Sequence, residues 1–166
     1  MSSDRRSARD EHQTSHRPSF GVAGTFLGIG LGGFIDGILL HQILQWHHMI
    51  SHEEAVDTVL GLERNTLADG LFHSFTWVAV LAGLALFATQ VDRAARPFST
   101  APLWGWILFG WGLFNVVEGL VNHHLLGIHH VRDDLSAPLS WDVGFLVFGV
   151  LLMGAGWLVQ RRSASD

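Results

Sequence analysis

The side chains best suited to chemistry in this sequence are its eleven histidines, because imidazole binds transition metals and exchanges protons near neutral pH. Two segments, residues 36–48 and 118–130, share one pattern: an acidic residue, glycine, three residues, histidine, five residues and a His-His pair. The second segment follows the first at an offset of 82 residues (118 − 36 = 82), and Gly30 and Gly112 match at the same offset. This spacing predicts an internal repeat that carries histidine and carboxylate ligands.

A further pair, Asp69 and His73, is spaced to present an oxygen and a nitrogen from one helix face. The candidate metal ligands are therefore His41, His73, His123, His124, Asp36, Glu118, Asp69, His47, His48, His129 and His130. We expect a centre made by His41, His73 and His123, completed by His124 or a carboxylate, because a four-helix bundle places such side chains together. The two His-His pairs would then form an access site or a second centre.

The two acidic residues of the repeat lie five residues before a histidine. On regular α-helices, Asp36 is therefore about 140° around the helix from His41, and Glu118 is placed in the same way relative to His123. We expect each carboxylate to bind a second ion or to support a ligand from another helix, rather than to share an ion with its own helix's histidine. The alternative is that both carboxylates only hydrogen-bond polar neighbours, such as Asn115, and fix the helix register.

The ligand types limit the choice of metal. Imidazole and carboxylate ligands without sulfur suit Zn²⁺, Cu²⁺, Fe²⁺ or Mn²⁺. The chain has no cysteine, which excludes disulfides, thiolate metal sites and iron–sulfur clusters. We expect a transition metal, with copper, zinc and iron as candidates. The alternative cofactor is haem, with His41 and His123 as axial ligands from facing helices.

The composition indicates that these ligands belong to a membrane protein. Of the 166 residues, 48% are hydrophobic and only 15% are charged, whereas a soluble domain carries about a quarter charged residues. The net charge of −5 argues against a nucleic-acid partner. Four apolar stretches have the roughly 20 residues that a helix needs to cross a bilayer. They are residues 20–44, 67–91, 103–126 and 141–159.

The pattern predicts an all-α fold, a four-helix transmembrane bundle built from two helical hairpins that repeat in parallel, with a pseudo-twofold axis along the membrane normal. Residues 20–160 would form one membrane domain. Residues 1–19 would be a disordered cytoplasmic tail, which holds His12 and His16, and residues 161–166 a short cytoplasmic tail. In the loop before the second span, residues 51–54 resemble a capping box that opens a short surface helix.

The arginines predict the orientation. Eight of the ten basic residues would lie on one side of the membrane, and two, Arg64 and Arg132, on the other. The eight are Arg5, Arg6, Arg9, Arg17, Arg93, Arg96, Arg161 and Arg162. The positive-inside rule then places both termini in the cytoplasm and the histidine-bearing ends of the spans outside. The expected location is the bacterial cytoplasmic (inner) membrane.

Glycines at every fourth position of the first span, Gly24, Gly28 and Gly32, form a close-packing face. Asp36 continues this face and is expected to point into the bundle. The face itself would pack either within the bundle or against a second copy of the chain.

The run at residues 32–42, the Trp46-His47-His48 that follows, and Glu118-Gly119 with His123-His124 carry a family resemblance. They resemble an uncharacterised bacterial family of four-span membrane proteins, a domain of unknown function. The resemblance covers residues 20–159. It implies a fold and a location, and it implies no mechanism.

Four functions fit these observations. The favoured one is an outward-facing site that binds, stores or delivers a transition metal, with the lipid bilayer as surroundings and a second copy or a respiratory-complex assembly factor as partner. A membrane di-metal oxidoreductase or hydrolase is the enzymatic alternative, and a haem protein is the third. A transporter or proton path is least favoured, because the inner half of each span contains no acidic residue.

Overall fold

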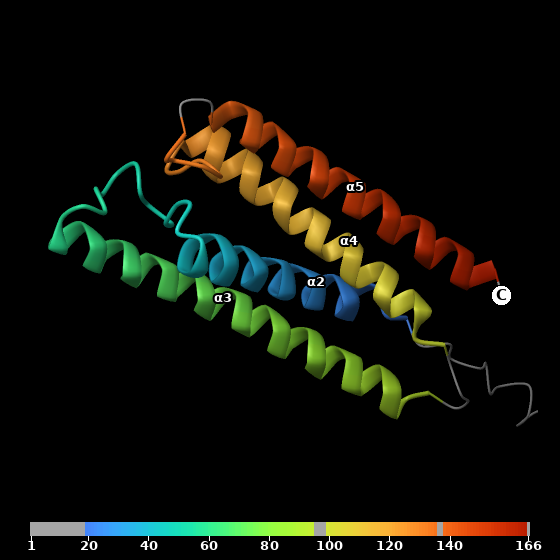
Figure 1. Ribbon diagram of the computed structural model, residues 1–166. Helices are drawn as coiled ribbons and strands as arrows, with labels where there is room; N and C mark the ends of the chain where they lie inside the picture. The colour runs from blue at the N-terminus through green and yellow to red at the C-terminus, as the bar shows by residue number, and fades with distance from the viewer. Residues whose placement is uncertain (1–18, 95–98, 136–137, 166) are drawn as a thin grey trace, which may run out of the picture.

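The computed structural model describes residues 19–94, 99–135 and 138–165. These residues form four long helices and no strand, which confirms the predicted all-α fold (Figure 1). The elements are α2 (Gly21–Ile35), η1 (Asp36–Ile43), α3 (Val59–Asp92), α4 (Ala101–Glu118), η2 (Gly119–Leu126) and α5 (Pro138–Ser165). The segment η1 continues α2, and η2 continues α4.

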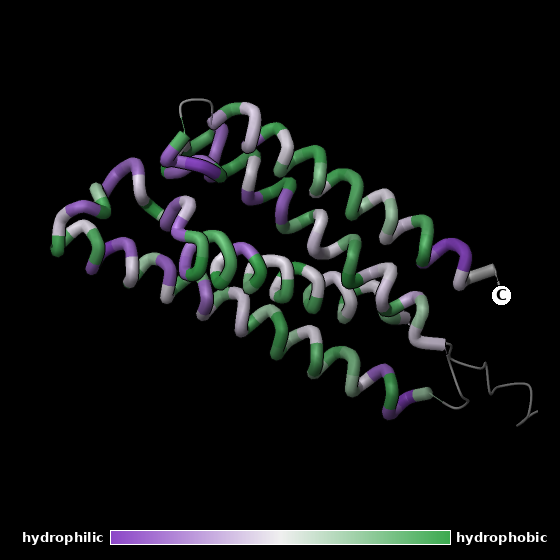
Figure 2. Tube along the Cα trace, viewed as in Figure 1, coloured by the Kyte–Doolittle hydropathy of each residue, from purple (hydrophilic) through white to green (hydrophobic). Residues whose placement is uncertain are grey.

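All four helices are long and apolar enough to cross a membrane. Hydrophobic residues cover most of their length, whereas hydrophilic residues gather in the loops at the end where η1 and η2 lie (Figure 2). The helices containing α2 and α4 bury 50% and 39% of their most apolar stretch, but α3 and α5 bury only 17% each. The central pair is therefore α2 and α4, and the outer pair exposes most of its apolar surface, as membrane-spanning helices do.

Glycines allow the central helices to approach closely. A Cβ atom on Gly28 would lie 2.7 Å from the Trp111 nitrogen and 2.8 Å from the Gly110 Cα of α4. On the outer sides, Gly83 of α3 packs against α2, and Gly156 of α5 packs against α4. The helices are consequently arranged in the order α3, α2, α4, α5 (Figure 1). Of the two predicted roles for the glycine face, the structure shows packing within the bundle.

The segments η1 and η2 are π-helical, which is rare at this length and frequent at functional sites. Their hydrogen bonds join residues five apart, as in the 2.8 Å bond from the Leu44 nitrogen to the Leu39 oxygen. Each segment is followed closely by a residue with positive φ, Gln45 at 50° and Gly127 at 61°. After each of these two segments the chain therefore turns sharply out of the helix, and both turns lie at the same end of the bundle.

The predicted capping box is wrong. Residues 51–54 form turns, and Ser51 bonds instead to the His48 oxygen and to the carboxylate of Asp133. The helix begins further along, where the Thr58 hydroxyl accepts a 3.0 Å bond from the Gly61 nitrogen. Because α3 begins at Val59, it extends the predicted second span by two turns.

The boundaries predicted near the two ends of the chain have different outcomes. Helix α5 begins at Pro138, three residues before the predicted fourth span, and continues to Ser165 through most of the predicted C-terminal tail. The predicted N-terminal tail, with His12 and His16, lies outside the described residues except for Ser19.

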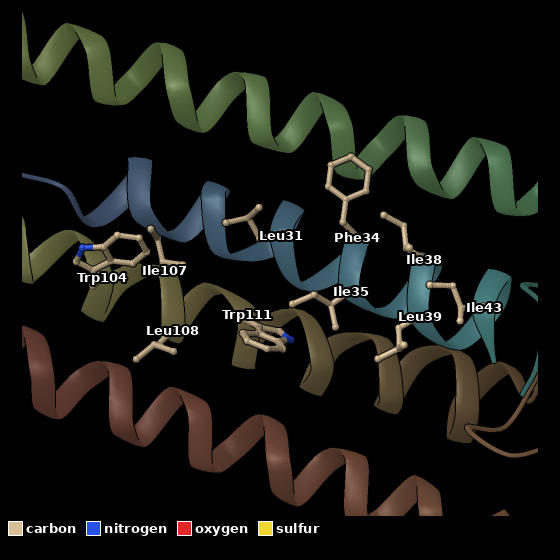
Figure 3. A pocket seen from close by; sticks show the side chains of 10 residues that line it. All are labelled: Leu31, Phe34, Ile35, Ile38, Leu39, Ile43, Trp104, Ile107, Leu108 and Trp111. Carbon is tan, nitrogen blue, oxygen red and sulfur yellow. The ribbon is translucent and has the colours of Figure 1, made fainter. Parts of the chain in front are cut away.

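An apolar groove lies on the lipid-facing side of α2, η1 and α4 (Figure 3). Leu31, Ile35 and Leu39 line one side, and Trp104, Leu108 and Trp111 line the other. The groove has no acidic residue or histidine in its lining, so it is separate from the candidate ligands. Such a surface suits lipid chains in a membrane-spanning protein.

Candidate metal centre

A first group of ligand atoms comes from η1 and the loop that follows it. Asp36, His41 and His47 are all buried, and one ligand atom from each lies within 4.8 Å of the others. His41 Nε2 is 3.2 Å from Asp36 Oδ2. One carboxylate and two imidazoles therefore surround a single small volume.

A second group comes from the end of α4, from η2 and from the loop that follows. Glu118, His123 and His129 are buried and meet the same 4.8 Å criterion. Glu118 Oε1 is 3.2 Å from His123 Nε2 and 3.0 Å from His129 Nε2. This group also holds one carboxylate and two imidazoles.

The expectation that each carboxylate would face away from its own helix's histidine is wrong. It assumed α-helical geometry, in which residues five apart are about 140° apart around the axis. In η1 and η2 the hydrogen bonds join residues five apart, which places such residues above one another. The π-helical turn is therefore what pairs Asp36 with His41, and Glu118 with His123.

Three of the four histidines of the two groups are oriented by a hydrogen bond at their second ring nitrogen. His41 Nδ1 donates to Asp69 at 2.8 Å, whereas His123 Nδ1 lies 3.5 Å from Asp142 without a hydrogen bond. The loop histidines use backbone oxygens: His47 Nδ1 donates to Val131, and His129 Nδ1 donates to Met49, both at 2.9 Å. A partner at Nδ1 fixes the ring and leaves Nε2 as the ligand atom, which is the usual arrangement at metal sites.

Several of these Nε2 atoms are buried without a well-formed hydrogen bond. This holds for His41, His47 and His123, and also for the second carboxylate oxygen of Glu118. Buried polar atoms in folded proteins are nearly always hydrogen-bonded, so a cluster of exceptions needs an explanation. An ion bound in each group would provide one, because it would give these Nε2 and carboxylate atoms a partner.

The two groups touch each other. The rings of His47 and His129 stack at a centroid distance of 4.6 Å and an angle of 10°. His41 lies 4.5 Å from His47, and His123 lies 4.9 Å from His129, measured between ring centroids. The four imidazoles therefore form one continuous cluster.

Burial lowers the pKa of His47 well below its usual value, and the neighbouring rings of His129 and His41 lower it further. A neutral imidazole is the form that binds a metal. His47 is therefore in the ligating state at neutral pH.

The other candidate ligands lie around the two groups rather than within them. Asp69 is buried and accepts bonds from His41 and from His48 Nδ1 at 2.7 Å. His130, which is partly exposed, donates to Asp142 at 2.6 Å. Asp69, His48 and His130 thus form a layer between the buried groups and the outer surface of the loops.

The structure does not bring His73 and His124 into either group. The His73 ring stacks with Phe34 and is tilted against Phe72, and its Nε2, also buried without a hydrogen bond, lies against Gly37. His124 is exposed. The loop histidines His47 and His129 take the places that the sequence assigned to these two residues.

Asp142, which is fully buried at the start of α5, is not among the residues predicted from the sequence. It accepts bonds from the Val131 nitrogen at 2.9 Å and from His130, and it faces His123. Asp69 makes the same set of contacts with the Met49 nitrogen, His48 and His41. Each of these three partners precedes its counterpart around Asp142 by 82 residues. The signal available was Asp-x-x-Phe, present at residues 69–72 and 142–145 with an offset of 73.

These observations define an all-helical protein with four helices of membrane-spanning length and two adjoining, buried His/carboxylate groups at one end. Residues 23–163 match the family described as "Predicted membrane protein (DUF2243)". The match covers most of the chain, so the protein belongs to this family of membrane proteins. No curated protein and no solved structure matches the chain.

Proposed function

We propose that this membrane protein binds transition metal ions at the two buried His/carboxylate groups. Its role would be to hold the metal, to deliver it or to cycle its oxidation state. The observation that carries the proposal is that His41 and His47 keep Nε2 buried without a hydrogen bond while a bond at Nδ1 fixes each ring. Copper, zinc and iron are the candidate ions, since imidazole with carboxylate and no sulfur suits all three.

The alternative in which these residues only fix helix register fits the geometry less well. Polar side chains that join helices within a bilayer do so by forming hydrogen bonds. Here His41 and His47 form such bonds through Nδ1, yet leave Nε2 buried without one. Two imidazoles arranged in this way beside a buried carboxylate favour a ligand site.

Haem is also a poorer fit than an ion. A macrocycle held by His41 and His123 would need an open slot between these two rings. His47 and His129 fill that region, because each lies within 5 Å of one of the two rings, centroid to centroid. A metal ion needs no such slot.

We also propose that the two hairpins, α2–α3 and α4–α5, are an internal repeat. The support is that corresponding contacts recur: His47 with Val131 and His129 with Met49, each pair related by 82 residues. Gly83 meets Leu27, and Gly156 meets Phe109, which follows the same offsets of 73 and 82 residues. These paired contacts would arise from a duplicated hairpin.

The metal groups would face the outside of the bacterial cytoplasmic membrane. Both groups lie at the bundle end formed by residues 44–58 and 127–135. The only basic residues at this end of the described chain are Arg64 and Arg132. The positive-inside rule then places the more basic, opposite end in the cytoplasm.

The test is elemental analysis with an absorption spectrum, on detergent-purified protein without a histidine tag. We expect stoichiometric metal and no haem absorption. His41→Ala and His123→Ala should each lower the metal content. His124→Ala is the matched control, because it removes an exposed imidazole next to His123 and should retain the metal. Equal metal content in all three variants would contradict the proposal.

A further inference from the structure

We propose that the two groups are halves of a single two-ion centre, in which each divalent ion has three protein ligands and keeps open positions for a small exogenous ligand. We further propose that neither half is complete without the other. The inference rests on the proposed metal binding and extends it to the number of ions, their reactivity and their coupling.

The ligand count supports two ions rather than one. Each group independently supplies one carboxylate and two imidazoles, all within 4.8 Å. Asp36 lies 3.2 Å from His41, and Glu118 lies 3.2 Å from His123 and 3.0 Å from His129. A single ion would leave one complete group of buried polar atoms unsatisfied, which is costly.

Three protein ligands per ion indicate an open centre. Structural zinc sites are closed by four protein ligands, whereas catalytic sites have three and reserve a position for water or substrate. Two histidines with one carboxylate are the ligand set of non-haem iron sites that activate small molecules. The other histidines near each group already have hydrogen-bond partners: His48 donates to Asp69, and His130 donates to Asp142.

The halves depend on each other through the loops. His47 belongs to the first group, but its Nδ1 donates to Val131 in the loop of the second hairpin. His129 belongs to the second group, and its Nδ1 donates to Met49 in the loop of the first. Each loop therefore orients a ligand for the opposite group.

Further contacts hold the two loops together as one unit. The backbone nitrogen of His52 donates to the backbone oxygen of Ile128 at 3.1 Å, and the backbone nitrogen of Asp133 donates to the backbone oxygen of Trp46 at 3.2 Å. The stacked His47 and His129 rings join the groups directly. Emptying one half would therefore loosen a ligand of the other.

The experiment is a Co²⁺ titration of the purified full-length protein, followed by visible absorption. We expect two ions per chain, and a change in the spectrum when azide is added, because azide would enter the open positions. Asp36→Asn and Glu118→Gln should each leave one ion, bound at least tenfold more weakly than in the unaltered protein. Supporting groups around metal ligands typically change affinity by about 10- to 100-fold.

Asp36→Glu and Glu118→Asp, which retain a carboxylate, should keep two ions, as should His124→Ala. Thermal unfolding of each variant separates lost binding from lost folding. One ion at saturation, no response to azide, or an unchanged affinity for the remaining ion would each overturn the inference while leaving metal binding intact. No Co²⁺ binding by the unaltered protein would overturn the proposed function as well.

Discussion

Two carboxylates from the outer helices, Asp69 of α3 and Asp142 of α5, orient the histidines of the central helices. Each one contacts two histidines and a backbone nitrogen of the neighbouring loop. In the proposed metal site they would therefore act through His41 and His123 rather than by direct ligation. Removing either charge should weaken the site without removing a ligand.

Asp142→Asn and Asp69→Asn should each lower metal affinity about 10- to 100-fold, because a neutral amide oxygen beside Nδ1 is a weaker acceptor than a carboxylate and makes the ligand ring less basic. Competition with a metal chelator measures the change. Asp134→Asn is the control, since Asp134 is exposed and bonds only to Arg132 among the interactions described. Equal affinity in all three variants would show that the two buried carboxylates have no such positioning role.

The sequence predicts most of the site's residues but not their roles. Asp36, His41, His47, Glu118, His123 and His129 all stand in the repeated pattern, so a constant offset finds them. Asp142 escapes this search because the first loop is longer, which changes the offset of the second helix of each hairpin from 82 to 73 residues. His73 occupies the first hairpin where Leu146 occupies the second, so it lies outside the pattern that the two groups share.

At the level of the elements, the π-helical segments η1 and η2 determine which side chains meet. The sequence does not distinguish a π-helix from an α-helix at these positions, because the two helix types show the same apolar spacing in a single sequence. The prediction from α-helical geometry was therefore wrong only for the pairs five residues apart, Asp36 with His41 and Glu118 with His123. The glycine face, in contrast, was predictable, since small residues every four positions fit one face of an α-helix.

Gly28→Ala should destabilise the bundle by about 1–3 kcal/mol, as overpacking of a tight contact does. Its new methyl group would meet backbone atoms of α4, at 2.7 Å from the Trp111 nitrogen, so the central helices would have to separate. The midpoint of thermal unfolding in detergent measures the effect.

Gly154→Ala is the control for this prediction, because a Cβ at Gly154 has no atom within 4 Å. Alanine there should leave the midpoint unchanged or raise it, since alanine favours a helix over glycine by up to about 1 kcal/mol. Similar midpoints for the two variants would show that the contact between α2 and α4 is looser than the structure indicates.

For the whole molecule, both His/carboxylate groups lie at one end of the bundle, and the ends of the described chain lie at the other (Figure 1). The four-helix arrangement was predictable from the length of the apolar stretches. The order α3, α2, α4, α5 was not, because it depends on which glycines meet which helix backbone. Under the proposed function, the orientation in the membrane determines which compartment would exchange metal with the site.

The absence of cysteine allows a direct test of orientation, because single cysteines can be introduced without background labelling. Asp57→Cys lies in the exposed loop before α3, at the metal end, and Ser99→Cys lies in the exposed segment before α4, at the opposite end. In right-side-out membrane vesicles, a membrane-impermeant maleimide should label Asp57→Cys at once and Ser99→Cys only after permeabilisation. This result is expected because eight of the ten arginines would lie on the side of Ser99, which the positive-inside rule assigns to the cytoplasm. The reverse labelling pattern would place the metal groups in the cytoplasm, where they would exchange metal with intracellular carriers instead of the outer compartment.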